Sequence, residues 1–400
     1  NSTLQLTGAN TYNGTTNITA GTLILVGSGA LGAGSTTVST GATLQIGNGT
    51  SSGGLSNLSG ITLCGTLAFD QATTSTTTVA AAISGTGSLT QMGPNSTVVL
   101  TNSANNYSGN TNINNGTLVL AGGALGSGTT TVASGATLQI GNGTISGPTP
   151  NSGNLVLNGT LSFDQVSGTT TAVNQNITGT GSLSQIGANS TVQLTGNNTY
   201  SGNTTVSNGT LMIGNGSTGS INGSSNINVS GNASTIAFNL SNSTTIANNI
   251  AGTNGSLMLA SSNTLTLTGT ANYTGVTNVS SGSIVFTNNA TPTTSGFTGS
   301  GAVTIQPNGS AFTNATTVNY TYVSTLTGLT VGNSSSTSNA NLTVNSAVAI
   351  AGPISLYGGA ISVNAGLTST GAGNAVLMKA SGCITTASNL TFQTNNGSLT

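Results

Sequence analysis

Four near-copies of one segment constrain this chain more than any other feature. The copies read NTYNGTTNITAGTLIL (10–25), NNYSGNTNINNGTLVL (105–120), NTYSGNTTVSNGTLMI (198–213) and ANYTGVTNVSSGSIVF (271–286). The first two lie 95 residues apart, and GTLAFDQ at 65–71 returns as GTLSFDQ at 159–165 after 94 residues. Such self-similarity predicts a chain built by stacking similar units, because each unit alone cannot bury its apolar side.

A shorter period lies inside each copy, where threonines open or enter T-x-L runs about every 20 residues. These threonines are Thr3, Thr22, Thr43 and Thr62 in the first copy, and Thr97, Thr117 and Thr137 in the second. Alternating apolar residues are typical of half-buried strands, and Gly or Asn turn signals bound every run. A strand signal at this spacing predicts a β-solenoid with roughly four or five coils in each long copy.

Charge is almost missing from the composition. The 400 residues include one Lys, two Asp and no His, so 1% of the chain is charged, whereas globular domains average about 25%. Disordered chains usually combine low hydrophobicity with high net charge, but here 34% of residues are hydrophobic and the net charge is −1. Strong helix formers are scarce and no window shows three-and-four apolar spacing. The sequence therefore predicts an ordered all-β fold without helices.

Export signals and membrane spans are not visible in the sequence. The longest apolar run, 79–83, is far shorter than the roughly 20 residues that cross a bilayer, so no transmembrane segment is expected. The chain begins at Asn1 without Met or a charged, apolar leader. We therefore expect the sequence to be a segment of a longer or processed protein.

Repetition has a physical purpose in a solenoid, because one coil needs equivalent apolar residues from the coils on either side. We expect Leu118 to point inward, and its neighbour Val119 to point outward and tolerate Thr. Asn-Gly pairs are expected at corners, since Gly adopts positive φ without strain and stacked Asn amides form ladders. These pairs are Asn13-Gly14, Asn115-Gly116 and Asn208-Gly209.

Each copy repeats a tyrosine, two glycines and an aliphatic residue at fixed spacing, and these are the candidate structural positions. They are Tyr12, Gly14, Gly21, Leu23, Tyr107, Gly109, Gly116, Leu118, Tyr200, Gly202, Gly209, Leu211, Tyr273, Gly275, Gly282 and Ile284. The tyrosines are interpreted as covers for a corner of the coil. A repeated aromatic stripe that stacks on sugar rings is the alternative.

Catalysis has few side chains to work with. General acid–base chemistry needs a group that titrates near working pH, and the only carboxylic acids are Asp70 and Asp164. They lie 94 residues apart, so we expect them to be several coils apart, beyond the roughly 5–9.5 Å of a glycosidase pair. A turn aspartate after a buried Phe69 or Phe163 is the preferred interpretation. The sequence predicts no enzymatic activity.

Two short motifs match the residue spacing of known catalytic or nucleotide-binding patterns, but their context favours structural roles. Lys379 lies near Ser381, but a solvated lysine is preferred to a catalytic dyad. GSGALG (27–32) fits G-x-G-x-x-G, yet the second copy reads AGGALG (121–126) and no helix is expected after either, so turn glycines explain both. Calcium-binding repeats would need an Asp in every coil, and phosphate contacts would need basic groups. We expect no metal, no cofactor and no nucleic acid partner.

The two cysteines are Cys64 and Cys383. They are 319 residues apart, about 16 coils, whereas a disulfide needs Cα atoms within about 7 Å, so no intramolecular bridge is expected. Cys64 is expected to point outward or lie in a turn. An idle thiol is preferred, and an intermolecular bridge stays open. The many Asn-x-Ser/Thr triplets, Asn48 and Asn142 among them, are attributed to composition.

The stretch GTGSLSQIGANSTVQLTGNNTYSGNTTVSNGTLMIGNG (179–216) resembles the autotransporter-associated β-strand repeat of bacterial autotransporter passengers and related surface proteins. Its matching positions are Gly181, Leu183, Gly187, Val192, Leu194, Gly196, Asn198, Tyr200, Gly202, Thr204, Gly209 and Leu211. Similar matches cover residues 1 to about 290. The family usually carries a Lys where this chain has Gln91 and Gln185. AGPISLYGGAISVNAGL (351–367) resembles the β-helical shafts of filamentous-haemagglutinin-like secreted exoproteins.

Both resemblances imply a right-handed parallel β-helix, here with about 20 residues per coil, exported to the bacterial cell surface or the extracellular space. We expect one continuous solenoid over 1–400, with long repeats at 1–95 and 96–189, a shorter repeat region at 190–290 and divergent coils at 291–400.

The expected function is a non-enzymatic structural rod, a shaft or filament that self-associates. An adhesin that binds a host or polysaccharide surface is the alternative. Ice binding by a flat threonine array is remote, because STTTVA and GTTTVA recur once per long copy and not once per coil.

Overall fold

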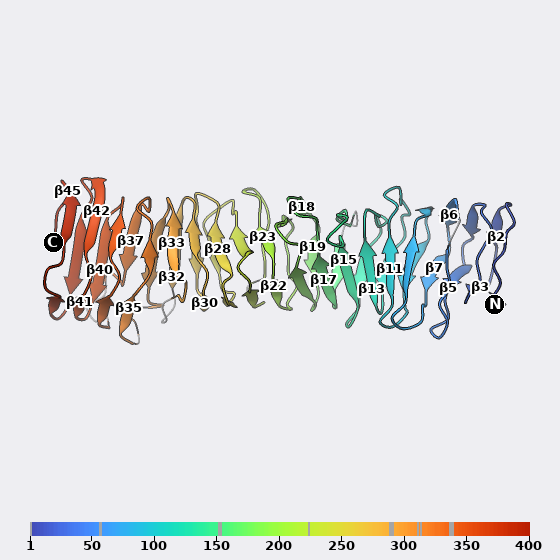
Figure 1. Cartoon of the computed structure of the whole chain (residues 1–400), viewed down its shortest axis with the longest axis horizontal. Coiled ribbons are helices and arrows are strands. Elements are labelled where there is room, and N and C mark those ends of the chain that lie inside the picture. The colour runs from blue at the N-terminus through green and yellow to red at the C-terminus, as the bar shows by residue number, and fades with distance from the viewer. Residues whose placement is uncertain are drawn as a thin grey trace. The chain divides into compact units, whose positions relative to one another are not determined.

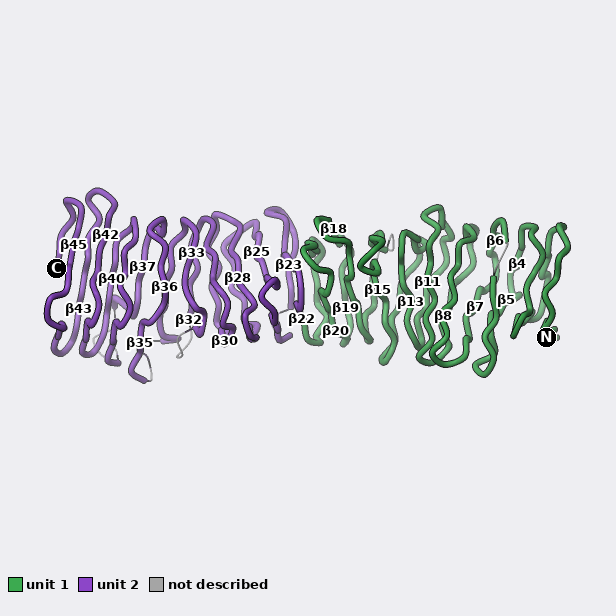
Figure 2. Tube along the Cα trace, in the orientation of Figure 1, with its two compact units in different colours: residues 1–204 green, residues 205–400 purple. Residues whose placement is uncertain are grey.

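The computed structural model is a parallel β-solenoid of about 18 turns with roughly 21 residues per turn, and its described residues contain no helix. It describes residues 2–55, 58–150, 154–222, 225–287, 292–309, 312, 314–335 and 340–400. The predicted all-β solenoid is confirmed, with a coil about one residue longer than expected. The chain divides into two compact units, 1–204 and 205–400, which are described separately (Figure 2). The predicted handedness and repeat boundaries stay predictions.

Unit 1 is a stack of short strands that run side by side across the coils (Figure 1). Its nine-stranded sheet contains β1 (Thr3–Leu6), β3 (Thr22–Leu25), β5 (Thr43–Ile46), β7 (Thr66–Phe69), β10 (Ser88–Gln91), β12 (Thr111–Ile113), β14 (Thr130–Val132), β16 (Asn154–Leu157) and β19 (Asn176–Thr178). A second ladder contains β8 (Thr76–Val79), β11 (Thr97–Leu100), β13 (Thr117–Leu120), β15 (Thr137–Ile140), β17 (Thr160–Phe163) and β20 (Ser182–Gln185). The remaining strands are β2 (Thr16–Ile18), β4 (Thr36–Val38), β6 (Gly60–Leu63) and β9 (Ala82–Ser84) in one ladder, and β18 (Thr170–Val173) with β21 (Thr191–Leu194) in another.

Unit 2 repeats this arrangement. Near its start are β22 (Thr204–Val206), β24 (Ile227–Val229), β27 (Ile250–Gly252) and β30 (Ala271–Tyr273). A longer ladder contains β23 (Gly209–Ile213), β25 (Ser234–Phe238), β28 (Ser256–Leu259), β31 (Thr277–Val279), β33 (Gly296–Gly299) and β36 (Thr321–Tyr322). The next contains β26 (Thr244–Ile246), β29 (Thr264–Leu267), β32 (Ser283–Thr287), β34 (Ala302–Gln306), β37 (Gly328–Val331), β40 (Ile354–Gly358) and β43 (Val376–Ala380). The last two contain β35 (Thr316–Val318), β38 (Leu342–Val344), β41 (Ile361–Val363) and β44 (Ile384–Thr386), and β39 (Val348–Ile350), β42 (Leu367–Ala372) and β45 (Phe392–Asn395).

The core of each unit consists of apolar columns that run from coil to coil. In unit 1, Leu25 pairs with Ile46, and Ile46 pairs with Phe69, and all three side chains are fully buried. Alternation within each strand places Leu and Val inward at every rung, as the sequence predicts. Stacked rungs therefore bury one continuous apolar interior in place of a single globular core.

Threonine columns correct part of the sequence interpretation. The strand-opening residues pair in register as Thr3, Thr22, Thr43, Thr66 and Ser88 in one sheet. In the second ladder they are Thr76, Thr97, Thr117, Thr137, Thr160 and Ser182. These columns confirm the predicted spacing of about 20 residues between the T-x-L threonines. One threonine, Thr62, was placed in the wrong column, because it lies inside β6 and pairs with Thr37.

Successive long copies are displaced around the solenoid by one strand. The ladder runs from β3, which carries GTLIL, through β5, β7 and β10 to β12, which makes four turns. The next strand along the chain, β13, carries GTLVL and lies in a different sheet. The long copy is therefore four turns plus one strand position, which explains why its length is not a multiple of the coil.

The shorter third copy follows the same rule with one coil fewer. From β23 the ladder reaches β25, β28 and β31 in three turns, and the next strand, β32, carries the fourth copy. The spacing from Gly209 to Gly282 is 73 residues, against 95 from Gly21 to Gly116. The third copy passes directly from GTLMI to GNGS, whereas the first two insert residues 26–46 and 121–140 at this point. A whole coil is absent, so the register of the remaining coils is kept.

Leu118 and Val119 lie on opposite faces of β13, as predicted, but both are shielded from water. Leu118 is fully buried in the interior, as expected, but Val119 is only 6% exposed. Val119 pairs with Val99 and Gln139 on the adjacent rungs, and these side chains flank it on the outer face of β13. Cross-strand neighbours of this size keep water from an outward residue. Val119 is therefore an outward residue that its neighbours cover, and its tolerance of Thr stays a prediction.

Candidate functional site

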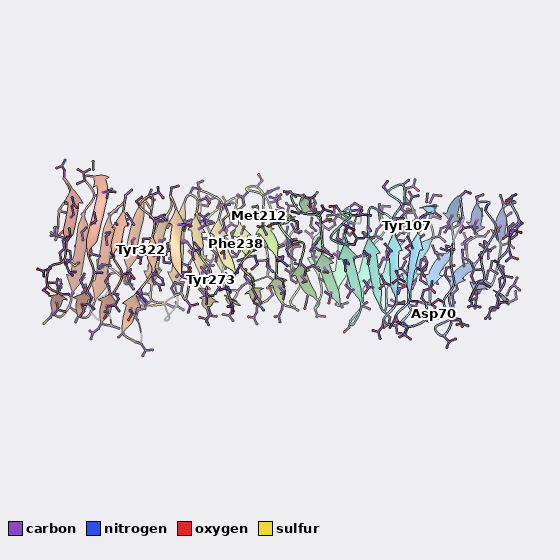
Figure 3. The ribbon with its side chains drawn as sticks, viewed as in Figure 1. Asp70, Tyr107, Met212, Phe238, Tyr273 and Tyr322 are labelled. Carbon is purple, nitrogen blue, oxygen red and sulfur yellow. The ribbon has the colours of Figure 1, made fainter. Side chains whose placement is uncertain are left out.

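The repeated tyrosines lie inside the coils. Tyr107, Tyr200 and Tyr273 are fully buried, and Figure 3 shows Tyr107 and Tyr273 among the strands. Burial raises the pKa of all three phenols above its ordinary value. Three of the four repeat tyrosines therefore cannot form a sugar-stacking stripe, and that alternative is wrong for them. Tyr12 is 40% exposed, and the coil that follows packs against it at Gly32.

Each repeat tyrosine has a threonine partner four residues later. The phenol and hydroxyl oxygens are 2.7 Å apart in Tyr107–Thr111 and Tyr200–Thr204, and 2.6 Å apart in Tyr273–Thr277. The corresponding pair Tyr12–Thr16 is separated by 2.5 Å. These threonines were missed as partners, although the spacing N-x-Y-x-G-x-T contains the signal. The pair satisfies two buried hydroxyls with one hydrogen bond.

The asparagine that precedes the tyrosine by two residues joins neighbouring coils. The Asn105 side-chain oxygen accepts from the Ile83 amide at 2.9 Å, and its nitrogen donates to the Ala124 carbonyl at 3.0 Å. In the next copy, the Asn198 oxygen accepts from the Ile177 amide at 3.1 Å. Both side chains are buried, so the amide replaces backbone pairing where the ladder has a gap.

The repeat glycines fall into two physical classes. Those in the G-T-L or G-S-I position all have positive φ, between 61° and 74°, and they are Gly21, Gly116, Gly209 and Gly282. Those in the Y-x-G position do not, and Gly14 in particular corrects the prediction of a positive-φ corner. A Cβ on Gly109, Gly202 or Gly275 would lie 2.2–2.3 Å from a carbonyl oxygen of the preceding coil. The first class serves backbone conformation, although Gly21, Gly116 and Gly282 are also closely packed against the preceding coil. In the second class, Gly109, Gly202 and Gly275 serve close stacking alone, whereas Gly14 has no neighbour within 4 Å.

The last glycine of GSGALG and AGGALG also has a packing role. A Cβ on Gly126 would lie 2.5 Å from the Tyr107 ring, and one on Gly32 would lie 2.6 Å from the Tyr12 ring. β-Strands and not helices follow both motifs, as predicted. These glycines make room for the tyrosine of the preceding coil.

The four aliphatic repeat positions are all buried. Leu23 is 7% exposed, and Leu118, Leu211 and Ile284 are fully buried. Gln91 and Gln185, which the family comparison singled out, also point inward and are fully buried, pairing with Phe69 and Phe163 on the preceding rung. Each donates from Nε2 to a serine hydroxyl at 2.9 Å, and its Oε1 has no partner among the described residues.

The aspartates belong to surface loops. Asp70 follows β7 directly after the fully buried Phe69, and it lies at the margin of unit 1 in Figure 3. Partial burial raises the pKa of the Asp70 carboxyl. Asp164 follows β17 after Phe163, which is 1% exposed, in a different sheet from β7. The backbone carbonyls of both aspartates join two coils, because they accept from the Gly49 and Gly143 amides at 2.7 Å.

The glutamines of the repeated F-D-Q triplet bind the ends of the loops 47–53 and 141–147 in the preceding coil. Sequence reasoning missed this role. The Gln71 side chain accepts from the Gly53 amide and donates to the Gly53 carbonyl, each at 2.9 Å. Gln165 makes the same pair of hydrogen bonds with Gly147, at 2.9 and 2.8 Å. Both glutamines are buried, and their return after 94 residues was the available signal.

Side chains of the types used in catalysis and metal binding are few in the described residues. Lys379 is exposed on β43, and the nearby Ser381 hydroxyl donates to the Gly359 carbonyl at 3.4 Å. The described ranges contain no group of three or more His, Cys, Asp or Glu side chains that could hold a metal ion. No helix in this part of the chain is long and apolar enough to cross a membrane.

Cys64 and Cys383 are both exposed and free. Cys64 borders a surface groove of about 450 Å³ in unit 1. The groove follows the glycines Gly65, Gly87 and Gly109, and hydroxyls and amides such as those of Ser88 and Asn112 flank it. Its lining carries no charged side chain. It is a shallow polar surface formed where stacked glycines leave no side chains.

Pairs of stacked asparagines occur in unit 2, at positions other than the three predicted Asn-Gly corners. The Asn249 side-chain amide donates to Asn226 at 3.2 Å, and that of Asn364 donates to Asn345 at 2.9 Å. Each pair joins two successive coils, so side-chain amides add a hydrogen bond alongside the backbone ladder.

Comparisons with known proteins give one family and no close relative. The passenger-associated-transport-repeat family matches residues 1–25, 95–120, 187–213 and 260–286. No curated protein and no solved structure gives a significant match to the chain. Each matched segment ends at one of the four buried G-T-L or G-S-I strands described above. With four passenger-associated-transport-repeats in a parallel β-solenoid, the chain matches an autotransporter passenger repeat protein.

Proposed function

We propose that this chain is a non-enzymatic shaft of an exported bacterial surface structure and that copies of it associate with one another. The family match supports a passenger region outside the cell or at its surface. Passenger repeats supply length and stiffness, because each coil adds one rung to the same stack.

The observation that carries the self-association is the uncharged surface of stacked coils. Outward columns are mainly threonine, serine, asparagine and glutamine, with Val99 and Val119 among them, and the whole sequence holds one Lys and two Asp. Hydroxyls and amides hydrogen-bond equally well to water or to a copy of themselves, and a net charge near zero favours association. Charge repulsion therefore does little to keep copies apart.

An adhesin is the second candidate, and one observation favours it. The groove beside Gly65, Gly87 and Gly109 presents hydroxyls, amides and backbone groups without charge, which suits a neutral polysaccharide. Ice binding is not proposed, because a flat threonine array would need a second threonine two positions after each residue of the threonine column, and the residues there differ from coil to coil. In the second ladder they are Thr78, Val99, Val119, Gln139, Ser162 and Ser184.

Sedimentation of the purified chain tests the proposal. We expect assemblies that persist from roughly 0.05 to 1 M salt, because almost no charges are available for screening. They should also change little between about pH 5 and pH 9, because the chain has no His and only two carboxylic acid side chains. A strictly monomeric particle throughout, or assemblies that dissolve at moderate salt, would leave the adhesin as the better function.

A matched pair of variants sharpens the test. Thr76 and Thr78 are exposed on β8, so Thr76→Lys with Thr78→Lys adds two positive charges to each copy without touching the interior. We expect this variant to associate less at low salt and to recover as salt rises. The control, Thr76→Ser with Thr78→Ser, keeps the hydroxyls and should assemble like the unmodified chain.

A further inference from the structure

Three surface loops share one sequence and one geometry. They are residues 47–53, 141–147 and 214–220, which begin GNGTS, GNGTI and GNGST and are called here the Gly-Asn-Gly loops. In each loop, both glycines have φ between 77° and 86°. The backbone amide of each loop asparagine donates to the carbonyl three residues later at 3.1 Å. The amide of the second glycine donates to a carbonyl of the following coil at 2.7–2.8 Å. The third loop keeps this geometry although the third copy lacks the coil that precedes the loop in the first two copies.

The asparagine of each loop, Asn48, Asn142 or Asn215, uses only half of its side chain. Asn142 Oδ1 accepts from the Thr144 amide at 3.1 Å, the Thr144 hydroxyl at 2.9 Å and the Ile145 amide at 2.7 Å. Asn48 makes the same three contacts at 3.2, 2.9 and 2.8 Å. Asn215 Oδ1 accepts from the Ser217 and Thr218 amides at 2.9 and 2.8 Å. The Nδ2 atoms of all three have no partner among the described residues.

The residue two positions after each asparagine is Thr or Ser, so each loop is an Asn-x-Ser/Thr triplet. A turn capped by Asn needs only the bonds from backbone amides to Oδ1. The hydroxyl of Thr50 or Thr144 is therefore more than the turn requires. Asn142 and Asn215 are exposed, and Asn48 is half-exposed.

We propose that Asn48, Asn142 and Asn215 are acceptor sites for asparagine glycosylation, a modification that goes beyond the proposed function. The donor class is a sugar activated as a nucleoside diphosphate and delivered by a glycosyltransferase. Nδ2 forms a bond to the anomeric carbon, the bond from that carbon to the phosphate oxygen breaks, and the nucleoside diphosphate leaves. One amide proton passes to a base of the transferase, and no oxidation or reduction occurs.

The loop geometry suits this reaction. Substitution at Nδ2 leaves every hydrogen bond to Oδ1 in place, so the loop keeps its fold after modification. The second glycine of each loop is not crowded: the nearest atom to a Cβ on Gly143 would be an Asp164 carboxylate oxygen at 3.4 Å, an ordinary van der Waals distance. A transferred sugar would add hydroxyls to a surface that has almost no charge for solvation.

Triplets inside strands provide the contrast. Asn176 begins an Asn-Ile-Thr triplet and its side chain is exposed, but it lies in β19, paired to Asn154 of β16. Its side-chain oxygen accepts from the Asn197 amide of the next coil at 2.7 Å. A transferase cannot draw this segment out without breaking the ladder, so Asn176 is the internal negative control.

Peptide mapping by mass spectrometry of the protein purified from the cells that produce it tests the proposal. We expect sugar on the peptides that contain Asn48, Asn142 and Asn215, and none on the peptide that contains Asn176. Unmodified loop peptides, or equal modification of Asn176, would overturn it. Deamidation at Asn-Gly is distinguished by its far smaller mass change. The sedimentation test of self-association uses unmodified protein, so the two proposals fail separately.

Variants at the second loop test the role of the hydroxyl in the same cells. We expect Asn142→Gln and Thr144→Ala to remove sugar from this peptide, and Thr144→Ser to retain it. Asn48 and Asn215 of the same variants serve as folded-state controls, because their modification should not change. Sugar that persists at Asn142 in Thr144→Ala would overturn the assignment.

Discussion

The phenol of Tyr107 is hydrogen-bonded to the Thr111 hydroxyl at 2.7 Å, and neither side chain is exposed by more than 1%. The same pair recurs in every copy of the repeat and is buried in three of the four. Because both hydroxyls of Tyr107–Thr111 are removed from water, each is the side-chain hydrogen-bond partner of the other. This mutual dependence makes the pair measurable by substitution.

Tyr107→Phe and Thr111→Val should each lower the free energy of unfolding by about 1–3 kcal/mol, because each leaves one buried hydroxyl without its partner. The double variant should cost less than the sum of the two, since it removes both hydroxyls together. Denaturant unfolding of all four proteins measures the coupling. Strictly additive losses would show that the hydrogen bond contributes nothing to stability.

Alkaline pH should destabilise the fold through the buried tyrosines. Burial raises the pKa of Tyr107, Tyr200 and Tyr273 above the ordinary value of 10.0, so the folded state keeps protons that the unfolded state loses. Stability is therefore fully present below about pH 10 and falls as pH rises, by up to about 1.4 kcal/mol per pH unit for each tyrosine. Denaturation midpoints between about pH 8 and pH 11.5 measure the slope.

Tyr107→Phe is the control for this slope. It removes one of the protons that the folded state retains, so its stability deficit relative to the unmodified chain should shrink as pH rises above about 10. A deficit that stays constant across this range would mean that Tyr107 ionises equally in both states.

Glycine substitutions should separate conformation from packing. Gly109→Ala should be severely destabilising, because its Cβ would lie 2.2 Å from the Gly87 carbonyl oxygen in the coil before it. Gly135 has φ of 81° and no neighbour within 4 Å, so Gly135→Ala should cost only the strain of positive φ, about 1–2 kcal/mol. Gly135→Asn should cost less than Gly135→Ala, since Asn tolerates this region better. Thermal unfolding of the three variants gives the order, and equal losses at Gly109 and Gly135 would contradict it.

Much of the fold could be predicted because the sequence repeats its own pattern. Thr97, Thr117 and Thr137 were predicted in one column, and they pair with one another in the structure. The burial of Val119 could not be predicted, because alternation identifies the face of a residue but not the size of its cross-strand neighbours. The position of Thr62 also depends on pairing across coils, because sequence spacing alone assigned it to the wrong column.

The repeat residues were easier to find than to explain. Tyr200 and Gly202 stand out in the sequence, but a buried tyrosine and one at an exposed corner produce the same spacing. Gly14 and Gly116 were given one explanation, whereas only Gly116 has positive φ. The closing of the loops by Gln71 depends on a contact with Gly53, 18 residues away, which no local pattern encodes. Long-range partners of this kind become visible only when the coils are stacked.

The inner and outer faces of β13 should respond differently to charge, even though both are shielded. Leu118→Asp places an unpaired carboxylate among apolar columns, which should cost several kcal/mol. Val119→Asp should cost less, because its outer face lies closer to water. Circular dichroism and thermal unfolding of both variants compare the losses. A larger loss for Val119→Asp would mean that the assignment of the two faces is inverted.

Removal of one whole coil should leave the solenoid folded. Deletion of residues 121–140 joins GTLVL directly to GNGT, which reproduces the natural junction between GTLMI and GNGS in the third copy. The strand that carries GTLVL then takes the place of β15 against β17, so Leu120 replaces Ile140 beside Phe163. In the third copy, Ile213 already pairs with Phe238 in this way. Stability should fall only by one coil and its interface, because neighbouring coils are otherwise unchanged.

Deletion of residues 121–130 is the matched control, since it removes about half a coil and leaves β15 out of register with its neighbours. We expect this shorter deletion to be far more damaging than the longer one, which would be unusual for a globular core but follows from stacking by whole turns. Circular dichroism and hydrogen exchange of the β17 amides compare the two proteins. If the half-coil deletion were as stable as the whole-coil deletion, the coil would not be the unit by which this chain gains and loses length.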